Sequence, residues 1–139
     1  MERECHICTP QTYNKEVLKY LKNPKNMGAM KDADAIAEDV SFCGDSMKMY
    51  VKIEKKKIKG KEKAFVKDVK FETTGCGGAV ATAEAISEFA KGKPVKEVKK
   101  VSAGKIIKIL RGLPEQKVHC CEMSVRTLQK ALASWENEN

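Results

Sequence analysis

Hydrophobic and polar residues alternate in two stretches in the first half of the chain. Apolar side chains occupy every second position from Met47 to Ile53, and they recur at Val69 and Phe71. Alternation with a period of two is typical of a strand that buries one face. The stretch between these positions is rich in lysine. The pattern therefore predicts two antiparallel strands joined by a long basic loop.

The residues before these strands predict a short helix followed by a loop. The helical stretch 11–22 stops at Asn23-Pro24, because the residue before a proline disfavours the α conformation. We expect residues 23–39 to form a loop.

The hydrophobic spacing changes after Cys76. From Ala79 to Ala90, apolar residues recur at spacings of four and three, which marks one face of a helix that ends near Lys91-Gly92. Two short helices are predicted beyond it, over residues 94–98 and 103–110.

A last helix is predicted over residues 120–135, where an apolar stripe runs from Cys121 to Trp135. Strands early and helices late in the chain indicate a single α+β domain. We expect this domain to cover residues 11–136, with a flexible N-terminal segment at 1–10 and a tail at 137–139.

Composition bounds the class of protein. The chain has 139 residues, of which 42% are hydrophobic and 33% charged, enough apolar material for one folded domain and too much for a disordered chain. No apolar run approaches the roughly 18–20 residues that cross a bilayer, and the charged start Met1–Cys5 does not resemble a signal peptide. We expect a soluble cytoplasmic protein with no membrane partner.

The net charge of +8 is concentrated in one region. Residues 48–72 hold ten lysines and four acidic residues, which leaves +6 in this stretch. Few aromatic residues interrupt it, so we expect a solvated basic hairpin and no nucleic-acid partner. A basic patch of this kind could equally dock an acidic protein.

Six cysteines carry more information than the charge. In a cytosolic chain, such a set indicates metal or thiol chemistry rather than disulfides. The Cys5-His6-Ile7-Cys8 segment holds two thiols and one histidine, which do not complete a tetrahedral site. Sharing a metal across a dimer and protecting the main site remain open roles for this segment. The cysteines are Cys5, Cys8, Cys43, Cys76, Cys120 and Cys121.

Three of these cysteines stand at the ends of predicted elements. Cys43-Gly44-Asp45 precedes the first predicted strand, Gly75-Cys76-Gly77 joins strand to helix, and Lys117–Cys120 leads into the last helix. Element ends are where loops bring distant residues together. The separations of 33 and 44 residues between the three cysteines are too long for a zinc finger, so the fold must assemble any shared site.

The residue types suit a soft metal. Three thiolates favour zinc, copper(I) or iron-sulfur units, and Asp45 or His119 offers a harder, more exchangeable fourth ligand. Cys76 precedes the positive end of a helix, which together with Lys117 favours thiolate over thiol. Such thiolates are also nucleophiles towards a persulfide. Cys121 begins the apolar stripe and is predicted to be a buried thiol, with acceptance or resolution of a persulfide on Cys120 as the alternative.

Five motifs in order resemble the IscU/NifU-type iron-sulfur cluster assembly scaffolds. The resemblance covers residues 13–135. The motifs are Tyr13–Val17, Asn23–Gly28, Cys43–Asp45, Gly75–Gly77 with the later Lys91-Gly92-Lys93, and Lys117–Cys120.

The resemblance implies a small three-stranded antiparallel sheet covered by helices, on which a labile 2Fe-2S cluster is built. It implies Cys43, Cys76 and Cys120 as ligands, with Asp45 tuning lability or ligating and His119 as the alternative fourth ligand. Lys117 matches a nearby base. In such a family a cysteine desulfurase or other sulfur donor passes persulfide sulfur to Cys120, a ferredoxin-type protein supplies electrons, and apo iron-sulfur proteins receive the cluster. The protein is then a carrier, not an enzyme.

The sequence departs from the family pattern in two places, and one other function competes with the scaffold. The family's proline-proline-valine chaperone motif is replaced by Pro114-Glu115-Gln116, and the basic loop is longer than usual. The competing function is a zinc-dependent sulfur acceptor, with Zn(II) on Cys43, Asp45, Cys76 and Cys120. Lys117 and His119 favour the scaffold, because relatives of the sulfur-acceptor kind tend to lack this pair. A sheet edge or the Tyr13 region could support a homodimer.

Overall fold

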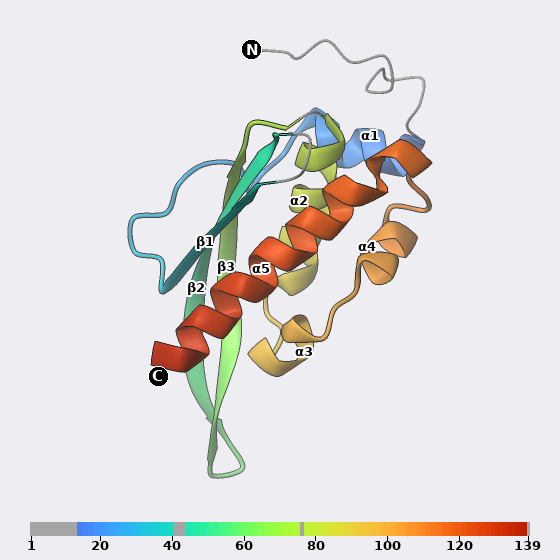
Figure 1. Cartoon of the computed structure of the whole chain (residues 1–139). Helices are drawn as coiled ribbons and strands as arrows, with labels where there is room; N and C mark the ends of the chain where they lie inside the picture. The colour runs from blue at the N-terminus through green and yellow to red at the C-terminus, as the bar shows by residue number, and fades with distance from the viewer. Residues whose placement is uncertain (1–13, 41–43, 76, 139) are drawn as a thin grey trace.

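The computed structural model describes residues 14–40, 44–75 and 77–138. It shows an α+β fold in which helices cover one face of a three-stranded antiparallel sheet, as expected (Figure 1). None of the helices in the described ranges is long and apolar enough to cross a membrane. The strands are β1 (Ala35–Val40), β2 (Ser46–Ile58) and β3 (Lys61–Thr73), and the helices are α1 (Lys15–Lys22), α2 (Gly77–Ala90), α3 (Val95–Lys99), α4 (Ala103–Ile109), the 3-10 helix η3 (Glu115–Lys117) and α5 (Val118–Glu138).

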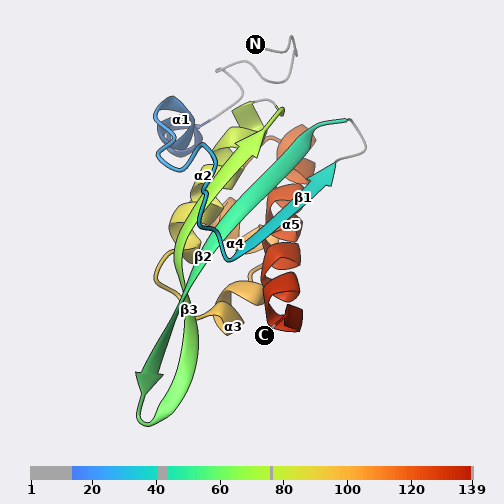
Figure 2. The ribbon, with the colours of Figure 1, turned by 90° about the vertical axis from the view of Figure 1, so that its left-hand side faces the viewer.

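The core lies between the sheet and the helices. The strand order is β1-β2-β3, and Figure 2 shows the sheet with the helices behind it. Helix α5 packs on β1 and β2, while α2 packs on β3 and on α5. The inward side chains of the strands are fully buried because alternate residues point to the same face. They include Met47, Met49, Val51, Val69 and Phe71.

The expected long basic loop is wrong, because β2 and β3 continue as a hairpin. Only Lys59 and Gly60 separate the strands, and both have positive φ, 54° and 80°. This backbone suits a two-residue hairpin turn, whose twist matches that of the strands. The alternation of apolar residues fades before the turn, but backbone pairing does not require apolar side chains.

A β-bulge lies where the hairpin leaves the core. Lys52 pairs with Asp68 and Ile53 with Val66, so Lys67 is an extra residue on β3. The insertion changes which residues of β3 point inward. As a result Val66 is buried, whereas Lys67 is exposed.

Strand β1 corrects the expectation of a loop over residues 23–39. It pairs antiparallel with β2 from Ala35 to Val40, at the edge of the sheet. Helix α5 covers this edge: Lys130 Nζ donates to the Glu38 carbonyl at 2.8 Å, and Arg126 pairs with Asp39. These long-range contacts compensate for a weak local strand pattern.

Helix α1 begins at Lys15 rather than at position 11. Asn14 caps it by accepting the Val17 N–H at 2.8 Å. The amide of the same side chain donates to the carbonyl of Leu110 at 3.0 Å and to the next two carbonyls. Asn14 thus stops the helix on one side and ties it to the end of α4 on the other.

The segment Lys25–Gly28 is held between α2 and β3. The buried carboxylate of Glu84 accepts the backbone N–H groups of Lys25 and Asn26 at 2.9 and 3.0 Å, and the Asn26 amide at 3.0 Å. On the other side, Phe71 donates to the Asn26 carbonyl at 2.9 Å, and Gly28 donates to the Phe71 carbonyl at 2.8 Å. This part of the Asn23–Gly28 motif therefore has a structural role.

Candidate functional site

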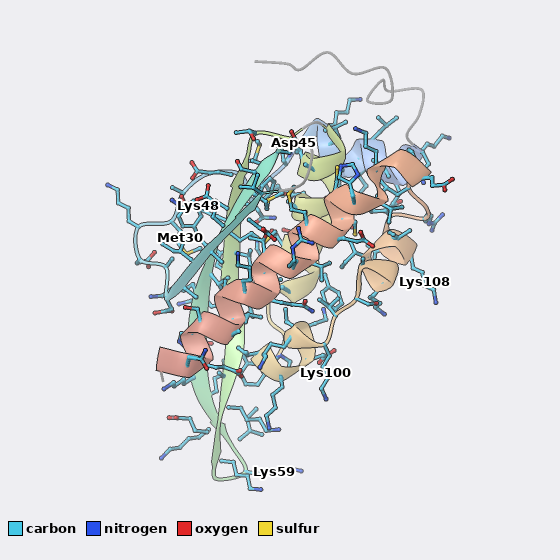
Figure 3. The ribbon with its side chains drawn as sticks, in the orientation of Figure 1. Met30, Asp45, Lys48, Lys59, Lys100 and Lys108 are labelled. Carbon is cyan, nitrogen blue, oxygen red and sulfur yellow. The ribbon has the colours of Figure 1, made fainter. Side chains whose placement is uncertain are left out.

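The sequence-predicted site residues that the structure describes lie near the starts of α2 and α5. Asp45 comes directly before β2 and is 5% exposed. Figure 3 labels it at the end of the sheet where α2 begins. Lys117, His119 and Cys120 follow one another at the junction of η3 and α5. Cys43 and Cys76, the other two predicted ligands, fall outside the described residues.

Gly75 brings the backbone before α2 close to Asp45. A Cβ atom at Gly75 would lie 2.6 Å from the Ala79 Cβ and 3.4 Å from the Asp45 Oδ2 atom. The first distance is too short for any side chain. Glycine at position 75 therefore allows the carboxylate of Asp45, the chain before α2 and the first turn of that helix to pack together.

Threonine and serine hold this junction in place. The Thr73 hydroxyl donates to the Ser46 carbonyl at 2.6 Å and accepts the Gly75 N–H at 3.0 Å. Thr74 Oγ1 accepts the Ser46 N–H at 3.0 Å. Because these bonds link the start of β2 to the end of β3, they set the position of Asp45 relative to Gly75.

Cys120 is buried in the first turn of α5 and is 1% exposed. Its Sγ atom lies 3.7 Å from the Nε2 atom of His119. Lys117 is also buried, at 4% exposed. The chain therefore places a thiol, an imidazole and an ammonium group within four residues of one another.

A pair of buried hydroxyls links Cys120 to α2, and sequence reasoning missed it. The Ser124 hydroxyl donates to the Cys120 carbonyl at 3.1 Å, and the Ser124 Oγ atom lies 3.1 Å from the Thr82 Oγ1 atom. Both residues are fully buried. The available signal was weak, because each helix carries two buried hydroxyl residues, Thr82 and Ser87 on α2 and Ser124 and Thr127 on α5. The bonds set the distance between the start of α5 and α2.

Asp45 and Cys120 thus approach α2 through different neighbours. Asp45 lies against Gly75 near the first turn of α2, and Cys120 is connected to Thr82 one turn further on. Among the described ranges, which leave out Cys43 and Cys76, no three His, Cys, Asp or Glu side chains gather into a metal-binding group. The Cys5–Cys8 segment and Tyr13 also fall outside these ranges.

Cys121 is a core residue. Its side chain is fully buried, and its thiol donates to the Ala103 carbonyl at 3.6 Å. Burial raises the pKa of this thiol to about 12. The prediction of a buried thiol agrees with this position, and the alternative of persulfide exchange loses support because the thiolate is the nucleophile in such exchange.

The raised pKa of Cys121 predicts a pH-dependent stability. In the unfolded chain the thiol loses its proton near its ordinary pKa of 9.0, whereas in the folded chain it keeps the proton up to about 12. Between these values the native state binds more protons, so the free energy of unfolding falls as pH rises, by at most about 1.4 kcal/mol per pH unit. We expect urea unfolding of the wild type to show a steeper loss above about pH 9 than a Cys121→Ala variant, in which the raised pKa values of Tyr20 and Tyr50 still contribute. A stability difference between the two proteins that does not change with pH would contradict this assignment.

Fold and side chains together define a class: a small α+β domain that carries thiol, imidazole and carboxylate groups at the starts of two helices. The family follows from comparison with known proteins. The model of the NifU-like N terminal domain family matches residues 12–139, and the chain belongs to this family. The resemblance found in the sequence motifs is thereby confirmed.

Individual relatives agree with this family. The chain is 34% identical to the iron-sulfur cluster assembly scaffold protein IscU 1 of Archaeoglobus fulgidus, over 91% of this chain and 78% of that protein. It is also 34% identical to the scaffold protein IscU of Aquifex aeolicus, over 88% of this chain and 75% of that protein. The crystal structure of a nitrogen-fixing NifU-like protein (N-terminal) from Brucella abortus has a TM-score of 0.69 and 17% identity, covering 92% of this chain and 96% of that one. This last likeness concerns the fold alone.

Proposed function

We propose that this protein is a scaffold on which an iron-sulfur cluster is assembled before transfer to apo-proteins. The observation that carries the proposal is the match of the family and of relatives named as cluster assembly scaffolds along most of the chain. The placement of Asp45 and Cys120 beside α2 supports it. The scaffold is a carrier, so the cluster is its cargo.

The cargo that suits these residues is a labile 2Fe-2S cluster. Cys43, Cys76 and Cys120 would supply three soft thiolates, and Asp45 a harder carboxylate that exchanges more readily. His119 is the alternative fourth ligand, because its imidazole lies next to the Cys120 thiol. One exchangeable ligand among four would favour release of the cluster over permanent storage.

Charge near the start of α2 would stabilise the thiolates and the anionic cluster. Helix α2 begins at Gly77, directly after Cys76, and its first backbone N–H groups have no partners within the helix. The partial positive charge there favours nearby anions. Lys117 would add a full positive charge on the side of Cys120.

Sulfur would arrive as a persulfide from a cysteine desulfurase or another donor. In this step the Cys120 thiolate attacks the outer sulfur of the donor persulfide. A new S–S bond forms at Cys120, the S–S bond of the donor breaks, and the donor cysteine leaves as a thiolate. A ferredoxin-type protein would supply the electrons that reduce this sulfur to sulfide.

Anaerobic reconstitution with ferrous iron and sulfide tests the proposal. We expect iron and acid-labile sulfide in equal amounts, together with visible charge-transfer bands. The competing function is a zinc-dependent sulfur acceptor on Cys43, Asp45, Cys76 and Cys120. Bound zinc that persists while iron and sulfide fail to form a cluster would favour that function and contradict the scaffold.

A further inference from the structure

The β2–β3 hairpin extends beyond the core of the domain. Ile53 and Val66 are the last cross-strand pair of which both residues pack on the core. Residues 54–65 form the hairpin tip, whose turn extends past the helices (Figures 1 and 2). Figure 3 places Lys59 of the turn at the opposite end of the molecule from Asp45. A partner bound to the hairpin tip would therefore leave the candidate site uncovered.

The hairpin tip carries a strong and incompletely neutralised positive charge. It holds six lysines and two glutamates, a net charge of +4 within twelve residues. Lys56 stands directly opposite Lys63, an arrangement of like charges that destabilises a strand pair. Lys56 has an ion pair with Glu54 at 3.3 Å, whereas no ion pair within the described ranges involves Lys59, Lys61 or Lys63.

One face of the hairpin tip combines this charge with apolar surface. Residues paired across the strands share a face, so Lys56 and Lys63 lie between the Glu54–Phe65 pair and the Ile58–Lys61 pair. Ile58 is 39% exposed. Phe65 is half-buried, with the Lys56 Nζ atom 5.4 Å from the centre of its ring. The exposed isoleucine and the lysines around it form a mixed apolar and cationic surface.

The opposite face of the hairpin tip is turned towards α5. There the Lys55 Nζ atom lies 5.8 Å from the centre of the Trp135 ring. Ala64, paired with Lys55, packs against the core. The face that carries Ile58 is therefore the one directed away from α5 and open to a partner.

We propose that the face of the hairpin tip around Ile58, Lys56, Lys61 and Lys63 docks a partner protein that presents an acidic rim around an apolar centre. Charge complementarity would steer the encounter, and burial of Ile58 would add affinity. A protein fits this surface better than a nucleic acid, because the face has no exposed aromatic ring to stack on bases and no arginine. This inference does not depend on the proposed scaffold function.

Binding of defined polyanions to the full chain tests the proposal. The probes are a random copolymer of glutamate and tyrosine, poly-L-glutamate and a short DNA duplex, each fluorescently labelled for anisotropy. We expect the copolymer to bind the wild type most tightly. The Lys61→Glu/Lys63→Glu variant should weaken this binding by about tenfold, since it reverses two charges on the docking face. Its fold should persist, because Lys56 then faces a glutamate.

Two controls separate docking from general charge effects. Lys100→Glu/Lys108→Glu alters the net charge equally at exposed positions outside the hairpin tip, and its affinity should stay within about twofold of wild type. Ile58→Ser should weaken binding of the copolymer by about threefold and leave poly-L-glutamate unchanged. Equal losses in both charge variants, tighter binding of DNA than of the copolymer, or no binding of the copolymer would each overturn the proposal.

Discussion

A Cys120→Ser variant is expected to lose the ability to hold a stable cluster. Serine preserves the size of the side chain but replaces a soft thiolate with a hydroxyl, which is a poor ligand for iron at neutral pH. The neighbouring fold should survive, because the Cys120 backbone carbonyl still accepts the Ser124 hydroxyl. After anaerobic reconstitution and gel filtration, we expect bound iron and sulfide to fall at least about tenfold below wild type.

The neighbouring cysteine provides a matched control. Cys121→Ala removes a thiol one position away on the same helix, but this thiol is buried in the core and its pKa is raised to about 12. We expect the alanine variant to bind iron and sulfide as the wild type does, with a moderate loss of stability. A normal cluster in Cys120→Ser, or loss of the cluster in Cys121→Ala alone, would refute the assignment of Cys120 as a ligand.

Replacement of Asp45 is expected to slow the release of the cluster rather than to prevent its assembly. In an Asp45→Ala variant the three proposed thiolate ligands would remain, and His119 would complete the proposed ligand set. Because imidazole is a softer ligand for iron than carboxylate, it should exchange less readily. We expect transfer to an apo-ferredoxin, followed by circular dichroism in the visible range, to become about three- to tenfold slower.

An acidic residue elsewhere in the chain tests the specificity of this effect. The Asp32 side chain is 76% exposed, its Oδ2 atom lies 3.8 Å from the Lys52 Nζ atom, and the residue is not a candidate ligand. Asp32→Ala changes the net charge as Asp45→Ala does, and its transfer rate should equal that of the wild type. Faster transfer from Asp45→Ala would show that the carboxylate holds the cluster instead of promoting its release.

The elements that could be predicted from the sequence are those whose hydrophobic pattern lies within a single stretch of the chain. The helices α2, α4 and α5 have apolar residues at helical spacing, and their observed bounds differ from the expected ones by only a few residues. Strand β1 could not be predicted in this way, since its Ala-Ile-Ala-Glu-Asp-Val segment has only a weak strand pattern. It depends on pairing with β2 and on Lys130 and Arg126 of α5, whose bonds to Glu38 and Asp39 span 92 and 87 residues.

The alternation of apolar residues predicted the β2–β3 hairpin near the core but not near its turn. Within the core, alternation from Met47 to Ile53 correctly predicted a strand. Beyond Ile53 the side chains are mostly charged, so the pattern no longer distinguished a strand from a loop. The sequence feature that marks the hairpin is the turn itself. Lys59 and Gly60 adopt the left-handed conformation that a two-residue hairpin turn needs.

The candidate site was predicted by motif position more than by geometry. The placement of Asp45 and Cys120 at element ends follows from the expected secondary structure. Their different neighbours on α2 do not, because they depend on a close approach at Gly75 and on the hydroxyl pair Thr82–Ser124. Both features arise from tertiary packing and leave only single small or hydroxyl residues as a sequence signal.

The burial of Cys120 would have a kinetic consequence for the sulfur delivery that we propose. If Cys120 is the persulfide acceptor that we propose, a thiol that is 1% exposed must become more accessible before it can meet the persulfide of a donor protein. The rate of sulfur loading would then be limited by the fraction of time that the thiol is accessible. The same burial would slow attack by peroxide and other diffusing oxidants. A donor that binds here and exposes the thiol would gain selective access, so burial would protect the proposed acceptor cysteine from other reagents.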